Sequence, residues 1–171
     1  MTRPFAALAL GCLAILAEPS AAAEKSASAQ TDPTIAKLSQ FIGGAWVNDN
    51  PNFKIEIRYQ WVFNKTAIRS TGIIDKGGPH ETAIESTVGW DPARKVAYYV
   101  DFHGGQTVFN GTAKLEGDEI HFDFVTLIGP PAKWRSVGKL PTPDQYEFTI
   151  FSEKDGKWTP AHEIKLHRVK Q

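Results

Sequence analysis

Residues 53–63 carry the clearest hydrophobic pattern in the chain. Within FKIEIRYQWVF every second side chain is apolar or aromatic, from Phe53 to Phe63, and most of the side chains between them are charged or polar. A period of two with one apolar and one polar face is typical of a strand in an antiparallel sheet that meets water on one side. The segment therefore predicts a strand of that kind.

Nine further segments have strand-like patterns and are separated by turn sequences. They span residues 45–50, 66–74, 81–90, 95–103, 106–115, 119–127, 132–140, 145–153 and 157–169. The joints contain residues that favour hairpins, such as Asp91-Pro92, Gly104-Gly105 and Asp155-Gly156. Ten sequential strands predict an all-β, up-and-down antiparallel barrel, because closure removes both exposed edges of the sheet.

A short helical pattern precedes these strands. Asp32 and Pro33 suit the N-cap and first position of a helix, apolar residues follow at helical spacing up to residue 42, and Gly43-Gly44 ends the pattern. A helix of about ten residues is marginal alone. We therefore expect it to pack at the base of the barrel.

The first 23 residues have the composition of a signal peptide. Arg3 gives a positive start, residues 5–17 are apolar, and Ala21-Ala22-Ala23 offers a cleavage site. The apolar run is shorter than the roughly 20 residues that span a bilayer. We predict cleavage after Ala23, a periplasmic or secreted location, a flexible tether over 24–32 and one barrel domain over 33–171.

Charge and cysteine content narrow the classes of partner and chemistry. Lysine and arginine balance aspartate and glutamate at 19 each, so no basic face for nucleic acid is indicated. Cys12 is the only cysteine and would leave with the signal peptide. A disulfide, a thiolate metal site and a cysteine nucleophile are therefore excluded from the mature chain.

The tripeptide Gly44-Ala45-Trp46 after the helix, with Arg168 on the last predicted strand, resembles the start and end of calycin barrels. That superfamily includes lipocalins, fatty-acid-binding proteins and ten-stranded nitrobindin-like barrels. The chain looks most similar to uncharacterised bacterial lipocalin-like barrels of the DUF1579 type. The resemblance implies that Gly44, Trp46 and Arg168 form the barrel floor, with Arg168 packed across Trp46. The alternative is a core tryptophan and a solvated terminal arginine.

Aromatic residues are the main candidates for ligand contact. Eight of them share the expected inward faces of the strands: Tyr59, Trp61, Trp90, Tyr98, Phe122, Phe124, Trp134 and Tyr146. Such a lining suits a small apolar ligand, with hydroxyl and indole N–H groups orienting it. The alternative is that these side chains fill the lumen and leave no cavity.

Histidine supplies a second hypothesis. His162 has the same parity as Ile164 and Leu166, so we expect it to face the lumen. Its distance from the chain end is similar to that of the haem-ligating histidine of nitrobindin-like barrels. The resemblance therefore raises haem binding or nitric oxide handling through His162 as an alternative. The alternative role of His162 is that of a hydrogen-bonded residue at the barrel mouth. The spacing of the histidines in the chain does not predict a metal site.

Two Asp/His pairs, Asp101 with His103 and His121 with Asp123, have the spacing of an acid–base couple. A barrel isomerase or hydrolase is thus a third hypothesis. The intervening Val100 and Phe102, and Phe122 and Phe124, resemble the core faces of their strands. We therefore expect both polar pairs to face solvent.

The sequence thus predicts an exported, monomeric lipocalin-like barrel without a recognisable catalytic motif. Its expected partner is a small apolar molecule held in the lumen, with no membrane span and no bound metal.

Overall fold

The computed structural model describes residues 32–77, 81–104 and 106–170. The predicted signal peptide, residues 1–23, lies outside the described residues, as does the predicted tether except for Asp32. His80, at the β3–β4 connection, is also outside them.

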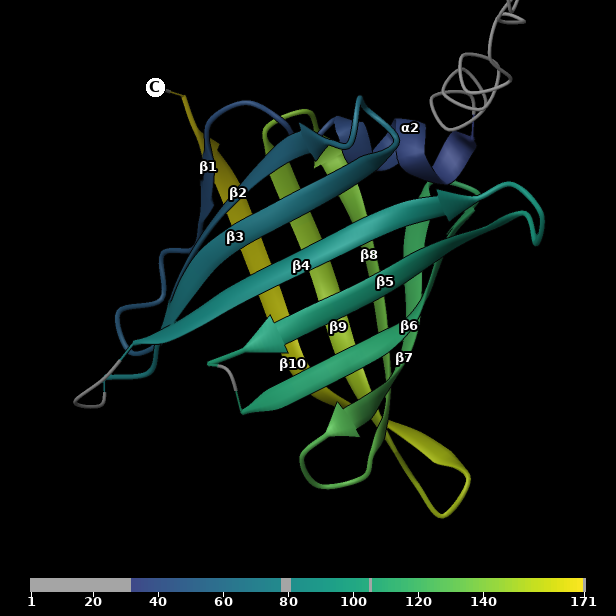
Figure 1. Cartoon of the computed structure of the whole chain (residues 1–171). Helices are drawn as coiled ribbons and strands as arrows, with labels where there is room; N and C mark the ends of the chain where they lie inside the picture. The colour runs from purple at the N-terminus through teal and green to yellow at the C-terminus, as the bar shows by residue number, and fades with distance from the viewer. Residues whose placement is uncertain (1–31, 78–80, 105, 171) are drawn as a thin grey trace, which may run out of the picture.

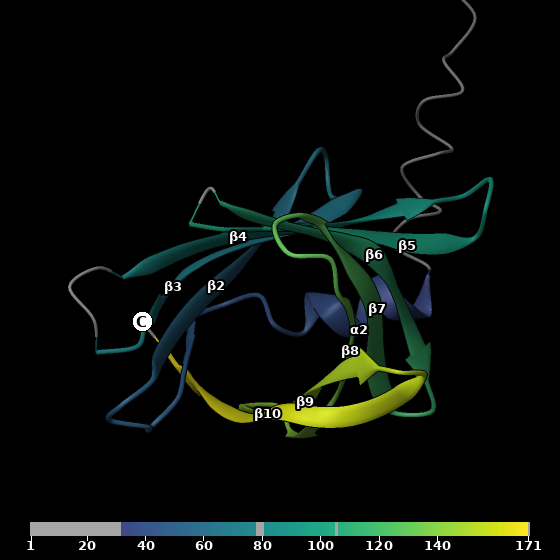
Figure 2. The same ribbon diagram turned by 90° about the horizontal axis from the view of Figure 1, so that it is seen from below.

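Ten antiparallel strands form one closed barrel (Figure 1). They are β1 (Ala45–Val47), β2 (Lys54–Val62), β3 (Ala67–Asp75), β4 (Thr82–Asp91), β5 (Val96–His103), β6 (Thr107–Glu116), β7 (Glu119–Ile128), β8 (Lys133–Thr142), β9 (Gln145–Lys154) and β10 (Lys157–Val169). Each strand pairs with its neighbours in the sequence, and β1 pairs with β10. The view from below shows the resulting ring (Figure 2). The predicted all-β, up-and-down barrel with a short N-terminal helix is confirmed.

Closure of the sheet depends on the short strand β1. Trp46 is in register with Ile57 of β2 on one side and with Arg168 of β10 on the other. The remaining strands pair over seven or more positions along almost their whole length, with β-bulges in β6–β7, β8–β9 and β9–β10.

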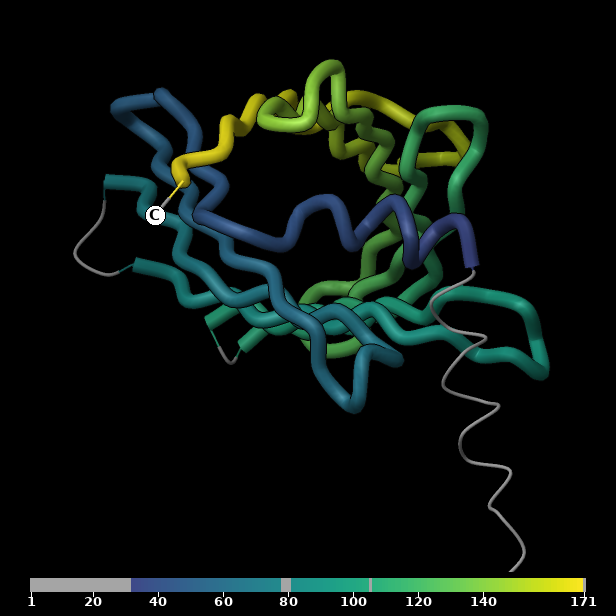
Figure 3. Tube along the Cα trace, turned by 90° about the horizontal axis from the view of Figure 1, so that it is seen from above, coloured from purple at the N-terminus to yellow at the C-terminus, as the bar shows by residue number. Residues whose placement is uncertain are grey.

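The helix α2 (Pro33–Ser39) lies across one end of the ring (Figure 3). Asp32 caps it, because its Oδ1 accepts hydrogen bonds from the backbone N–H groups of Thr34 and Ile35 at 2.9 and 3.0 Å. Ile35 and Leu38 are buried against the barrel. No helix in the described part of the chain is long and apolar enough to cross a membrane.

Phe41, just after the helix, organises the apolar floor of the barrel. Its ring lies 5.1 Å from that of Trp46, 5.1 Å from that of Tyr59 and 4.7 Å from that of Tyr146. The carbonyl of Phe41 also accepts a hydrogen bond from the indole N–H of Trp46 at 2.8 Å. Trp46 and Phe41 are almost completely buried. The floor is therefore sealed by packed aromatic rings.

Arg168 covers this floor from the outside. Its guanidinium lies 4.6 Å from the ring centre of Trp46, which is the arrangement that the calycin resemblance implies. The same group donates hydrogen bonds to backbone carbonyls of residues in two other segments: Gln40, Ile42, Gly43 and Pro143. Its Nε lies 3.1 Å from a carboxylate oxygen of Asp144. One side chain thus joins β10 to the helix end and to the β8–β9 turn.

The close approach of β10 to the chain before β1 requires glycine at position 44. Its φ is +84°, and a Cβ placed on it would lie 2.4 Å from the carbonyl oxygen of Val169. A side chain there would push β10 away from the chain entering β1, because Cβ atoms do not approach backbone oxygens so closely. Glycine at this position lets Arg168 reach the carbonyls beneath the helix.

Replacing Arg168 with leucine should destabilise the barrel strongly. The change leaves four backbone carbonyls without their donor and removes the cation that covers Trp46, and we expect a loss of about 2–4 kcal/mol in unfolding free energy. Urea denaturation followed by circular dichroism measures it. Arg135→Leu is the matched control, because Arg135 also pairs with a carboxylate and lies over a tryptophan, but on the outer surface. For Arg135→Leu we expect a loss of roughly 1 kcal/mol or less in unfolding free energy. Equal losses in the two variants would contradict the role assigned to Arg168.

Candidate ligand-binding cavity

A cavity of about 340 Å³ lies inside the barrel, above the aromatic floor. Leu38, Phe41 and Tyr146 line its closed end, where α2 covers the ring. Lys76 and His162 line it toward the opposite end, where both residues are exposed. The lumen is therefore open at one end and is not filled by side chains.

Six of the nine predicted ligand-contact residues line this cavity: Tyr59, Phe122, Phe124, Trp134, Tyr146 and His162. Trp61 and Trp90 lie outside its lining and pack against the buried core instead. The prediction that Tyr98 faces the lumen is wrong. Its side chain is 39% exposed on the outer surface, where the phenolic oxygen accepts a hydrogen bond from Arg94.

The register of the β4–β5 hairpin explains the error at Tyr98. Trp90, which packs inward, is paired with Ala97, and directly opposed residues in a sheet share a face. Tyr99, Asp101 and His103 therefore also point inward, and the cavity is lined by all three. Phe102 is 47% exposed on the outside. The expectation that Asp101 and His103 face solvent, with Val100 and Phe102 toward the core, is thus wrong for β5.

On β7 the corresponding expectation matches the structure. Phe122 and Phe124 line the cavity. Asp123 points outward and pairs with Arg135 at 2.7 Å. His121 lies on the same outer face, within 3.5 Å of carboxylate oxygens of Glu116 and Glu119.

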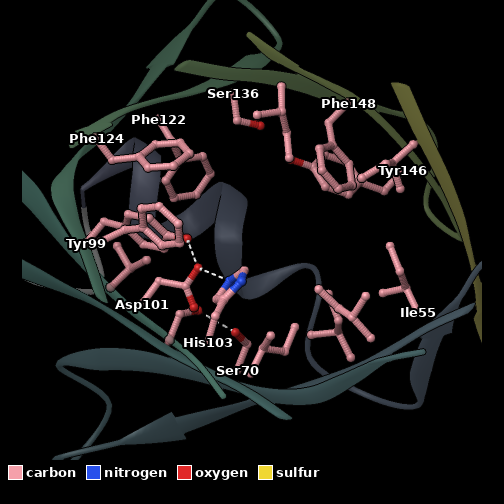
Figure 4. Close-up of a pocket in the computed structure, with 18 of the residues that line it drawn as sticks. Ile55, Ser70, Tyr99, Asp101, His103, Phe122, Phe124, Ser136, Tyr146 and Phe148 are labelled. Carbon is pink, nitrogen blue, oxygen red and sulfur yellow. Dashed lines mark hydrogen bonds and ion pairs between the residues drawn. The ribbon is translucent and has the colours of Figure 1, made fainter. Parts of the chain in front are cut away.

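Asp101 is the centre of a hydrogen-bonded cluster inside the cavity (Figure 4). Its Oδ2 accepts a hydrogen bond from the hydroxyl of Tyr99 at 2.7 Å and lies 2.8 Å from Nε2 of His103. Asp101 is only 7% exposed. A carboxylate so far from bulk water requires hydrogen-bond donors, and the two neighbours on its own strand supply them.

Two serines lie beside this cluster on the neighbouring part of the sheet and are hydrogen-bonded to each other. Ser70 on β3 is opposite Ser86 on β4, and Ser86 is opposite Asp101 on β5. The serine hydroxyls lie 2.5 Å apart. We call Ser70, Ser86, Tyr99, Asp101 and His103 the polar wall. Facing it across the lumen, β8–β10 present mainly apolar residues, among them Trp134, Phe148, Ile150 and Ile164.

Gly138 on β8 allows Tyr146 to lean over the cavity floor. A Cβ at Gly138 would lie 2.7 Å from the hydroxyl oxygen of Tyr146 and 2.5 Å from Cβ of Phe148. Those distances are shorter than non-bonded contacts permit, so the glycine makes room for the stacked rings of Tyr146 and Phe148, 4.9 Å apart.

The tyrosines of the cavity are held in their neutral form. Burial raises the pKa of Tyr59, Tyr99 and Tyr146 well above 10, and the negative charge of Asp101 raises that of Tyr59 and Tyr99 further. The three phenols therefore remain hydrogen-bond donors at neutral pH. Asp101 contributes an acceptor, and its neighbour His103 can accept or donate a proton. Among the described residues no group of three or more His, Cys, Asp or Glu side chains is placed to hold a metal ion.

Comparison with solved structures supports the fold. The crystal structure of Rv2717c from M. tuberculosis aligns with 81% of this chain and 98% of that chain, with 15% identity and a TM-score of 0.54. A protein of unknown function from the DUF3598 family of Nostoc punctiforme aligns with 81% of this chain and 100% of that chain, with 12% identity. Its TM-score of 0.27 is too low to show a shared fold. No protein-family model matches the chain, and no curated protein sequence matches it. The likeness to Rv2717c therefore supports the fold alone, a closed antiparallel β-barrel.

The buried tyrosines should make the barrel less stable in alkali. Unfolded tyrosines ionise near pH 10.0, whereas the folded protein keeps these three protonated above that pH. The folded state then binds more protons, so the unfolding free energy falls above pH 10, by up to about 1.4 kcal/mol per pH unit for each tyrosine. Below pH 10 these groups add no pH dependence.

Urea denaturation at pH 8, 10 and 11 measures this slope, and Tyr146→Phe should reduce it. Absorbance at 295 nm reports phenolate in the folded protein. A phenolate signal of the folded wild type that is smaller in Tyr146→Phe, or a slope unchanged in Tyr146→Phe, would contradict the burial of this hydroxyl.

Proposed function

We propose that the protein is an exported lipocalin-like binding protein that holds a small, mainly apolar molecule in its lumen. The single observation that carries this proposal is the cavity of about 340 Å³, closed at the helix end and lined largely by apolar and aromatic side chains. Its volume is within the range of about 300–1,000 Å³ that small-molecule sites occupy.

The shape of the cavity favours non-covalent binding of a small molecule that is enclosed by the barrel. The floor of Phe41 and Tyr146 prevents passage through the barrel, so a ligand enters and leaves by the open end. Rings on several strands surround the space, including Tyr99 and Phe122 with centres 5.0 Å apart. Burying an apolar molecule among them releases about 25 cal/mol for each Å² removed from water.

Export is the part of this proposal that rests on the sequence of residues 1–23, and a DUF1579-type family membership rests on the resemblance at Gly44, Trp46 and Arg168. Haem binding through His162 stays a prediction. His162 lines the cavity and is exposed there.

A second candidate function, acid–base catalysis, is favoured by the inward placement of Asp101 and His103. A carboxylate bonded to Nε2 fixes the orientation of an imidazole, and the other ring nitrogen is then available for proton transfer. This would make the barrel an isomerase or hydrolase for an apolar substrate. Exchange of ligand C–H hydrogens for deuterium in D₂O, seen by NMR with the wild type and lost in His103→Phe, distinguishes catalysis from binding alone.

A larger side chain in the lumen should weaken ligand binding without unfolding the barrel. Ile150 lines the cavity and is paired with His162 toward the open end, so Ile150→Trp places a larger ring in the ligand space. We expect affinity for an apolar fluorescent probe such as N-phenyl-1-naphthylamine to fall about tenfold or more, as steric exclusion requires.

Thr149→Trp is the control, because Thr149 precedes Ile150 on the same strand and points to the other face. It should bind the probe like the wild type. Both variants must keep the wild-type circular dichroism spectrum. Wild-type affinity in Ile150→Trp would place the probe outside the lumen, and no binding by the wild type would remove the proposal.

A further inference from the structure

The carboxylate of Asp101 has an arrangement that barrel stability does not explain. Its hydrogen-bond partners, Tyr99 and His103, lie two residues away on the same strand. The cluster therefore joins β5 to no other strand. Both contacts end on Oδ2, and among the described residues no side chain donates a hydrogen bond to Oδ1. A costly buried charge is thus held at the cavity surface with one oxygen available as an acceptor.

We propose that Asp101 is a ligand-recognition residue and that the cavity selects apolar molecules bearing a protonated amine. This inference rests on the proposed function, since it requires that a ligand occupies the lumen. An ammonium group donates up to three hydrogen bonds, and a bond between an ammonium and a carboxylate is about twice as strong as one between neutral groups. The hydroxyls of Ser86 on the adjacent strand β4 and of Ser70 on the next strand β3 can accept the remaining N–H groups.

Aromatic rings beside Asp101 favour the same class of ligand. Tyr99, which donates to the carboxylate, lies 5.0 Å from Phe122 and 5.6 Å from Phe124 between ring centres. Phe109 is opposite Asp101 on β6 and lies 5.1 Å from His103. Ring faces attract cations and stack with flat apolar bodies. The surroundings of Asp101 therefore suit an aromatic or cyclic amine.

The other ionisable side chains that line the cavity do not neutralise the negative charge of Asp101. His103 is bonded to Asp101 itself. Lys76 lines the cavity where it is exposed, so water screens its charge, and His162 is exposed as well. An apolar carboxylate inserted beside the polar wall would meet the like charge of Asp101, without a buried cation to balance it. The cavity should thus reject fatty-acid-like molecules.

Three probes with one ring system test this inference at neutral pH. They are 1-methylnaphthalene, 1-naphthylmethylamine and 1-naphthoate, each titrated against the full-length mature protein by calorimetry or by displacement of a bound fluorophore. We expect the amine to bind about tenfold or more tightly than the carboxylate, as one charge-assisted hydrogen bond predicts. The neutral hydrocarbon should have intermediate affinity.

Asp101→Asn should reduce amine affinity to about that of the hydrocarbon. Asp123→Asn is the matched control, because it removes an aspartate from the outer face of the barrel and should leave the preference unchanged. Equal binding of the two charged probes by the wild type, tighter binding of the carboxylate, or an equal effect of the two variants would overturn the inference and leave the apolar-ligand proposal standing.

If none of the three probes binds the wild type, the apolar-ligand proposal fails together with the inference. Circular dichroism must show that each variant is folded. Should Asp101→Asn not fold, the ratio of amine to carboxylate affinity in the wild type decides the question alone.

Discussion

The contact between Arg168 and Trp46 holds the closed end of the barrel together. The three residues of β1 supply few ladder hydrogen bonds, so pairing alone closes the sheet weakly at this seam. The guanidinium adds carbonyl contacts to the segment after α2 and to the β8–β9 turn, while its face covers Trp46. Helix, first strand, last strand and one hairpin thus meet at one side chain. With this end sealed, the lumen can be open only at the other.

The interior of the barrel combines a packed floor with an unfilled upper part. Below, Phe41, Trp46 and Tyr146 pack at ring distances near 5 Å and exclude water. Above, the polar wall of β3–β5 faces apolar side chains of β8–β10 across open space. Stability alone favours apolar side chains in place of a buried carboxylate. The position of Asp101 inside a cavity, bonded only within its own strand, therefore indicates a role toward a bound molecule.

Most of the architecture could be predicted from the sequence because the strands alternate cleanly and the turns carry distinctive residues. The segment 53–63 predicts β2 to within a residue at each end, and Asp32-Pro33 marks the start of α2. The candidate site was less predictable at β5. There both faces contain aromatic residues, so alternation alone predicts that Tyr98 and Phe102 lie on the inward face. The length of the 92–95 turn sets the register that pairs Trp90 with Ala97. Because Ala97 then faces inward, Tyr98 faces outward. The rule that polar side chains face solvent is also weaker beside a cavity, because a lumen that is not packed has room for Asp101 and His103.

Native mass spectrometry of the protein purified from a periplasmic expression host tests ligand binding in the lumen most directly. The apolar-ligand proposal predicts a non-covalent adduct of small-molecule mass on the folded wild type, released on denaturation and absent from Ile150→Trp. The wild type at its bare mass, even after incubation with the three naphthalene probes, would contradict it. So would an adduct of equal abundance on Ile150→Trp, because the molecule would then lie outside the cavity.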